Sequence, residues 1–186
     1  QIGDGNTATI GLGKSGDTIN IPAGATIANA GTATGFGGAN TPNFFVSLTN
    51  NVGITDNTIT KIPFNTEVFD TDNAFDNSSN YRFTVPSGKA GKYYFTFQGQ
   101  MGILKHYQIT IYLRKNGSTI GTEAIFPNGY EQSADNNIRS HYTTLLNLVA
   151  GDYIEMYVKI NNNGTQSAFL HGDNFVTFFT GFRLVE

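Results

Sequence analysis

The sequence contains no cysteine, and this absence excludes a disulfide framework and any metal site built on thiolates. Charged residues are scarce too: they make up 13% of the 186 residues, where about a quarter is usual in soluble domains. The formal net charge of −3 leaves no electrostatic footprint for nucleic acid or for an anionic membrane. Since no apolar run is long enough to span a bilayer, we expect neither nucleic acid nor membrane insertion among the partners of this chain.

Recognisable catalytic motifs are also missing. The three histidines, His106, His141 and His171, lie far apart in the sequence without an acid in a familiar arrangement. No glycine-rich loop precedes a helix, which disfavours phosphate binding. We therefore expect no enzymatic activity, no catalytic residue and no cofactor.

The best metal candidate is the segment of residues 70–76. Its carboxylates, Asp70, Asp72 and Asp76, are spaced as oxygen ligands for Ca²⁺ would be. The segment lacks the glycine and the distal glutamate of an EF-hand, and an ordinary turn is the favoured interpretation. No metal site is predicted.

Residues 1–40 differ in composition from the rest of the chain. Gly, Ala and Thr dominate, and large apolar anchors such as Ile10, Ile19 and Ile27 recur at wide spacing. One copy of so thin a segment buries too little apolar area to offset its ordering entropy. It is either a flexible linker or a set of strands stabilised by sister chains, and the spaced isoleucines favour the second. The chain begins at Gln1, without an initiator Met or a signal peptide, so we expect it to be the C-terminal fragment of a longer protein.

Residues 41–186 are predicted to form a second, all-β domain. Short stretches of alternating hydrophobicity recur between Asn, Gly and Asp turns, and 153–160 is the clearest of them. The pair Asn116-Gly117 predicts a two-residue hairpin after the strand 108–114. About ten such strands without a crossover helix indicate an antiparallel sandwich of the jelly-roll type.

The C-terminal segment is apolar on both of its faces. Val176, Phe178 and Phe182 alternate with Phe175 and Phe179, whereas a strand with one solvated face would place polar residues on one side. We therefore expect a central strand whose second face meets another subunit.

Several motifs follow one another in a familiar order: Phe44-Phe-Val, then Gly91-Lys-Tyr-Tyr-Phe-Thr-Phe97, then Leu148-Val-Ala-Gly-Asp152, and finally Phe179-Thr-Gly-Phe-Arg-Leu184. With them, residues 44–186 resemble the globular domain shared by complement C1q and, more distantly, tumour necrosis factor. Two features of animal members are missing, namely their cysteines and a collagen stem.

The resemblance implies a homotrimer in which one sheet of each subunit faces the three-fold axis. The residues that it places at this trimer interface are Tyr94, Thr96, Gln98, Tyr153, Glu155, Tyr157, Phe175, Thr177 and Phe179. Their strand neighbours are expected in the sandwich core: Tyr93, Phe95, Phe97, Ile154, Met156, Val158, Phe178, Phe182 and Leu184. An interface position for Glu155 would bring three carboxylates together, which is costly unless each of them has a partner.

The Gly/Ala/Thr-rich segment 1–40 resembles stretches of bacteriophage fibre and virion proteins. We therefore expect a trimeric virion fibre or spike head on the virion surface, which binds a host-cell glycan or protein or decorates the capsid. Other virion proteins would be contacted through the N-terminal side. The alternative is a secreted C1q-like recognition module that binds carbohydrate or protein.

The longest polar loop of the domain is the candidate ligand-binding segment. It offers an aromatic ring with polar neighbours, a combination that suits sugar recognition. The candidate residues are Asn128, Tyr130, Glu131, Gln132 and Asp135. A solvated connection is the competing interpretation, because loops are polar by default.

Overall fold

The computed structural model describes residues 14–26, 40–102, 108–125, 137–161, 168–173 and 175–184. The chain divides into two compact units, Gln1–Phe36 and Gly37–Glu186. The described part of the first unit contains two turns: the Asp17 N–H donates to the Lys14 carbonyl at 3.0 Å, and the Ala25 N–H donates to the Pro22 carbonyl at 3.1 Å. The stretch between these two turns is exposed.

The second unit is built of strands, and no helix occurs among the described residues. Within that part of the chain there is consequently no helix that could cross a membrane. The strands are β1 (Asn43–Ser47), β2 (Val52–Ile54), β3 (Thr60–Lys61), β4 (Thr66–Asp70), β5 (Phe75–Asp76), β6 (Arg82–Thr84), β7 (Gly91–Gly102), β8 (Gln108–Lys115), β9 (Ser118–Ile125), β10 (Asn137–Leu148), β11 (Tyr153–Asn161), β12 (Ala168–Leu170) and β13 (Phe178–Arg183).

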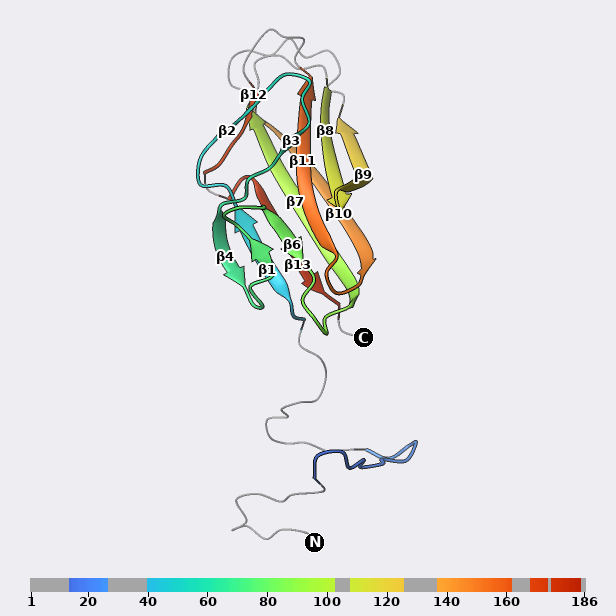
Figure 1. The fold of residues 1–186 in the computed structure, drawn as a ribbon. Coiled ribbons are helices and arrows are strands. Elements are labelled where there is room, and N and C mark those ends of the chain that lie inside the picture. The colour runs from blue at the N-terminus through green and yellow to red at the C-terminus, as the bar shows by residue number, and fades with distance from the viewer. Residues whose placement is uncertain are drawn as a thin grey trace. The chain divides into compact units, whose positions relative to one another are not determined.

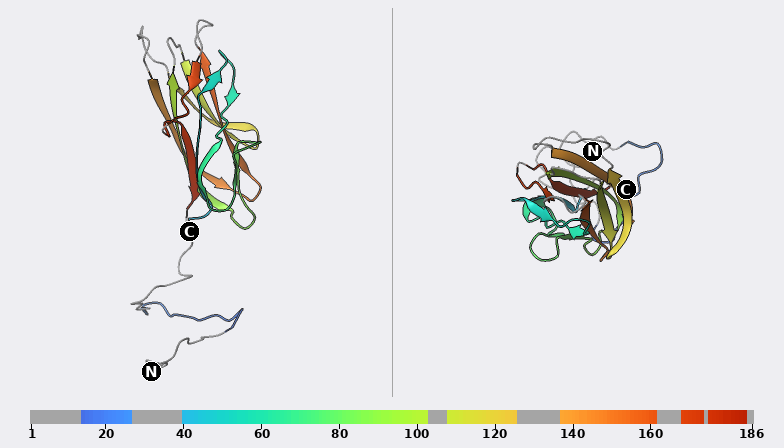
Figure 2. Two further views of the ribbon diagram at one scale, coloured as in Figure 1. Left: turned by 90° about the vertical axis from the view of Figure 1, so that its left-hand side faces the viewer. Right: turned by 90° about the horizontal axis from the view of Figure 1, so that it is seen from above.

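These strands form two antiparallel sheets that pack face to face (Figures 1 and 2). Sheet A has the order β2-β12-β7-β13-β1-β4, and β10 pairs with the long strand β7 from Gly91 to Gly102. Sheet B has the order β5-β6-β11-β8-β9, and β3 also pairs with β11. The predicted all-β sandwich of the jelly-roll type is confirmed.

Sheet B follows the alternation of its sequence. On β11, Ile154, Met156, Val158 and Ile160 are buried between the sheets, so the residues between them point outward. The hairpin from β8 to β9 turns at Asn116-Gly117, where Asn116 has φ 51° and Gly117 has φ 80°. Two consecutive residues with positive φ form the turn that matches strand twist, as the sequence predicts.

The core between the sheets contains a cluster of packed aromatic rings. Phe44 of β1 lies at its centre, with ring centroids 5.0 Å from Phe83, 5.1 Å from Phe179 and 5.2 Å from Phe75. Phe95 of β7 stacks on Phe179 at 5.7 Å. Offset and edge-to-face ring pairs of this kind add about 0.5–1.5 kcal/mol each beyond their buried area.

Candidate subunit interface

The outer face of sheet A, which points away from the core, carries a row of aromatic side chains. On β13, Phe179 and Gly181 are buried, whereas Phe178, Thr180 and Phe182 are only half-buried. The register with β7 places Phe178 opposite Gln98 and Phe182 opposite Tyr94, and the register with β1 places Phe45 opposite Thr180. We define the outer face of sheet A by Phe45, Phe69, Tyr94, Thr96, Gln98, Leu145, Phe175, Phe178, Thr180 and Phe182.

The rings of this face contact one another along the sheet. The Phe45 ring centroid lies 5.1 Å from that of Phe178, 6.0 Å from that of Phe175 and 6.2 Å from that of Phe69. Large parts of the face remain open to solvent: the exposed fraction is 46% for Phe69, 53% for Phe175 and 63% for Leu145. The outer face of sheet A therefore carries large exposed apolar side chains on an already complete sandwich.

Polar side chains on this face are engaged within the chain. The Thr180 hydroxyl donates to the Phe44 carbonyl at 2.7 Å, and the Gln98 amide donates to the Val176 carbonyl at 3.1 Å. The hydroxyls of Thr96 and Thr143 lie 3.3 Å apart and bond to each other. Because these hydrogen bonds are already made, another protein surface could cover the face without leaving those donors unpaired.

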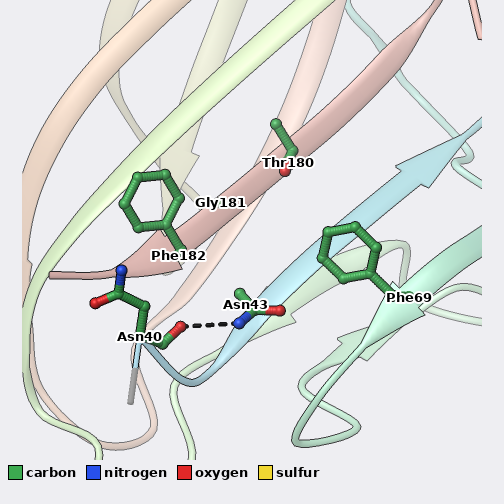
Figure 3. Close-up of a pocket in the computed structure, with 6 residues that line it drawn as sticks. All are labelled: Asn40, Asn43, Phe69, Thr180, Gly181 and Phe182. Atoms are coloured by element: carbon green, nitrogen blue, oxygen red, sulfur yellow. Dashed lines mark hydrogen bonds between the residues drawn. The ribbon is translucent and has the colours of Figure 1, made fainter. Parts of the chain in front are cut away.

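A hollow of about 340 Å³ opens on the same face (Figure 3). The rings of Phe69 and Phe182 stand on either side of it, and Asn43 donates its side-chain amide to the Asn40 carbonyl at 3.0 Å at its rim. Thr180 and Gly181 of β13 complete the lining. The hollow is therefore largely apolar and can seat a side chain from outside.

The nine residues predicted at the trimer interface do not share one face. Tyr94, Thr96, Gln98 and Phe175 belong to the outer face of sheet A. A second group lies on β11 of the other sheet and consists of Tyr153, Glu155 and Tyr157. This separation could not be predicted, because alternation identifies the two faces of a strand and not the sheet to which the strand belongs.

Thr177 and Phe179 lie on neither outer face, and their predicted outward position is wrong. Both are 1% exposed; the Thr177 hydroxyl accepts from the Gln100 N–H at 3.1 Å. The expected core position of Phe178 and Phe182 is also wrong, because both side chains lie on the outer face of sheet A. A turn at Phe175, with φ 53°, interrupts the strand before β13 begins, so alternation counted from Phe175 does not continue through it.

Of the other residues expected in the core, one lies outside it and six lie within it. Leu184, past the end of β13, is half-buried and not in the core. The expected core side of β7 and β11 is confirmed by burial of Tyr93, Phe95, Phe97, Ile154, Met156 and Val158. These two strands have a clean alternation in sequence, and they follow it in the structure.

Glu155 has the partner that its burial requires. It is 5% exposed, and its carboxylate accepts from the Lys61 ammonium at 2.5 Å and from the Tyr157 hydroxyl at 3.4 Å. The anticipated meeting of three carboxylates does not arise from the outer face of sheet A, because Glu155 points out of sheet B.

The acidic segment 70–76 uses its carboxylates as turn acceptors. Asp76 accepts from the backbone N–H groups of Ser79 and Ser78 and from the Asn80 side chain, and these bonds hold the pKa of the Asp76 carboxyl well below its usual range. Asp72 pairs with Lys89 at 3.4 Å. Among the residues that the structure describes, no group of three or more His, Cys, Asp or Glu side chains is placed to hold a metal ion.

The loop residues predicted to bind a ligand lie outside the described residues. They are Asn128, Tyr130, Glu131, Gln132 and Asp135. Their role therefore stays a prediction from sequence.

Sequence reasoning missed several members of the outer face of sheet A. Phe45 and Phe69 were not assigned to it, although two adjacent phenylalanines, Phe44 and Phe45, must point to opposite faces of one strand. Leu145 could have been assigned in the same way, because it is adjacent to Leu146 in a predicted strand and the two side chains must point to opposite faces.

The profile of the C1q domain family matches residues 43–184. The chain therefore belongs to the C1q domain family. Domains of this family commonly form trimers and mediate recognition, and they are typically extracellular and non-enzymatic. A search of curated proteins gave no match.

Solved structures with the same fold come from both branches of the C1q/TNF-like group. The globular domain of zebrafish complement 1qA superposes with a TM-score of 0.53 at 16% identity, covering 77% of this chain and 97% of that one. Murine APRIL at pH 8.5 superposes with a TM-score of 0.54 at 15% identity, covering 76% and 98%. At such identities the likeness establishes the fold alone.

Proposed function

We propose that residues 41–186 form the head of a homotrimer, and that this head is a recognition domain of a virion fibre or spike. The outer face of sheet A carries the proposal. A contiguous apolar patch on a complete domain marks a surface that another protein covers. A trimer is supported by what is common in the C1q domain family.

Burial of this face would supply substantial association energy. Phe69, Leu145 and Phe175 are each about half exposed or more, and full burial of such a side chain contributes about 1.5–3 kcal/mol. In a cyclic trimer every contact occurs three times. Folding and assembly are then expected to be coupled, with little folded monomer at low concentration.

The layout of the face suits a ring rather than a two-fold pair. Leu145 projects from β10, which is one edge of sheet A, whereas the hollow beside Phe69 lies toward β4, which is the other edge. A head-to-tail contact brings different parts of the surface together, so a projection at one edge can fill a hollow at the opposite edge. Three such contacts close a trimer.

The N-terminal segment, residues 1–40, is proposed to be a stalk that sister chains stabilise. Within its described part, Ile19 is 57% exposed and Ile21 is 46% exposed, and these residues lie between the two turns of that unit. Equivalent segments of two sister chains would give both side chains a place to be buried. Other virion proteins would attach through this side.

The proposed role at the virion surface is attachment to a host-cell glycan or protein, with capsid decoration as the other virion role. The loop 128–137 is the proposed contact segment, and weak sites on three subunits would act together through multivalency. The trimeric recognition fold and the fibre-like composition of residues 1–40 support this role.

Competition for adsorption tests the host-binding role. Purified wild-type chain should reduce adsorption of the parent virus to its host cells in a dose-dependent way, and a variant with loop 128–137 replaced by Gly and Ser should compete less well. Both proteins should have the same sedimentation coefficient, which controls for assembly. No competition by the assembled wild-type chain would contradict host attachment and leave capsid decoration.

A further inference from the structure

Two arginine–tyrosine pairs lie on the outer side of sheet B. The Arg82 guanidinium carbon is 4.2 Å from the Tyr153 ring centroid, and that of Arg114 is 4.1 Å from the Tyr157 ring centroid. The arginines come from β6 and β8, which pair with β11 between them. Tyr153 and Tyr157 are four residues apart on β11, which is about 13 Å along a strand.

Among the outward-pointing residues of β3, β5, β6, β8 and β11, basic side chains outnumber acidic ones, although the whole chain carries a net charge of −3. The charged residues among them are Lys61, Asp76, Arg82, Arg114, Glu155 and Lys159. Four are basic and two are acidic, so the local balance is +2. We call this surface, together with Tyr153 and Tyr157, the Arg–Tyr face.

The two acidic groups of the Arg–Tyr face are already engaged. Glu155 accepts from Lys61, and Asp76 accepts from donors of its own turn, among them Ser78 and Asn80. Within the part of the chain that the structure describes, neither Arg82 nor Arg114 makes an ion pair with a carboxylate.

Stacking on tyrosine orients each guanidinium without using its N–H groups. Tyr157 lies beneath Arg114, and the Arg114 Nε is buried with no hydrogen-bond partner. The terminal N–H groups of a guanidinium held in this way can form the paired hydrogen bonds that carboxylate and sulfate accept. The tyrosines are thus positioning residues for two anion-binding groups.

A shallow hollow of about 360 Å³ adjoins the first pair. Arg82, Asn80, Asn73 and Asp72 are among its lining residues. Amides and carboxylates next to a guanidinium are groups that bind sugar hydroxyls beside an acidic substituent.

We propose that the Arg–Tyr face binds an acidic polysaccharide, with Arg82 and Arg114 holding two of its sulfate or carboxylate groups. Their separation requires an extended ligand with repeated charges rather than a single sugar. A nucleic acid suits the surface less well, because the arginines cover the rings on which bases would stack.

This inference rests on the proposed recognition role for its biological setting, but its test uses purified full-length chain. Binding to dextran sulfate, polygalacturonate, uncharged dextran and single-stranded DNA would be measured at one protein concentration and several salt concentrations. We expect binding to at least one of the two acidic polysaccharides, weakening with salt, and none to uncharged dextran. The two acidic probes distinguish sulfate from carboxylate.

The decisive variant is Arg82→Gln/Arg114→Gln, and its matched control is Lys14→Gln/Lys92→Gln, which removes the same charge elsewhere. The first should weaken polysaccharide binding by about tenfold or more, because the ligand loses the charged hydrogen bonds of both arginines. The control should change it less than about twofold. Arg82→Gln alone serves if the double variant unfolds.

Equal weakening by both double variants would overturn the proposal, since total charge would then explain the binding. Tighter binding to DNA than to either acidic polysaccharide would also overturn it, as would no binding to any acidic probe. The last result leaves host attachment through other segments open. Conversely, a wild-type chain that binds polysaccharide but does not compete with the parent virus for adsorption would refute the host-attachment role and leave this inference standing.

Discussion

Phe182 of β13 and Tyr94 of β7 lie directly opposite each other on the outer face of sheet A, with ring centroids 5.3 Å apart. Both rings are only half-buried within one chain. The inner side of the same strand carries Phe179, which is 1% exposed. Phe179 and Phe182 of one strand therefore lie on opposite faces. Phe179 packs in the sandwich core, and Phe182 lies at the proposed subunit interface.

Phe182→Asp is expected to abolish the trimer. The substitution would place three carboxylates in a surface that assembly removes from water, and unpaired charges are not tolerated there. Sedimentation velocity would show loss of the trimer peak. Ile120→Asp is the matched control, because Ile120 is 45% exposed and lies on β9 of the other sheet; if the control dissociated equally, the interface would be wrongly placed.

Phe179→Ala is expected to lower the stability of the fold itself. Phe179 contacts Phe44, Phe64, Phe75 and Phe95 in the core, and removal of a buried phenylalanine ring costs about 3–5 kcal/mol. Chemical denaturation at a fixed protein concentration would measure the loss. A change below about 1 kcal/mol would contradict the core position of this ring.

Glu155→Gln is expected to leave the trimer intact and to lower the free energy of unfolding by about 1–3 kcal/mol, because a bond between charged groups is weakened. Glu155 and its partner Lys61 belong to sheet B, away from the outer face of sheet A. Sedimentation and denaturation of the same sample separate the two effects. Dissociation without loss of stability would show that β11 lies at the subunit interface after all.

Acid is expected to destabilise the domain between about pH 4 and pH 2. The hydrogen bond from Lys115, at 2.7 Å, is the largest cause that lowers the pKa of Asp152 from 3.8 to about 2. A carboxyl with a lowered pKa in the folded state contributes stability that is present above pH 4 and is lost as the pH falls toward 2. In Asp152→Asn the unfolding free energy should fall less steeply over this range; an unchanged slope would contradict the assignment.

The sequence was sufficient for the fold and for two of the strands at its centre. On β7 and β11, large apolar residues occupy every second position, so Phe95 and Met156 could be assigned to the core by alternation alone. On β13 both faces are apolar, and the turn at Phe175 interrupts the alternation of the sequence. The sequence pattern therefore could not decide which of Phe179 and Phe182 lies in the core. Packing of Phe179 against Phe44 decides it in the folded chain.

The Arg–Tyr face lay beyond sequence reasoning for a different reason. Arg82, Arg114 and Tyr157 belong to three strands that are far apart in the chain, and only the neighbour order β6-β11-β8 brings them together. Local patterns carry no information on that order.

Sedimentation equilibrium of the wild-type chain tests the central claim most directly. At micromolar concentration the outer face of sheet A should be covered, and the measured mass should be three times that of one chain. Dilution should lower the trimer fraction together with the folded signal in circular dichroism, because assembly and folding are coupled. A folded species with the mass of one chain at that concentration would contradict the trimer and the role assigned to this face.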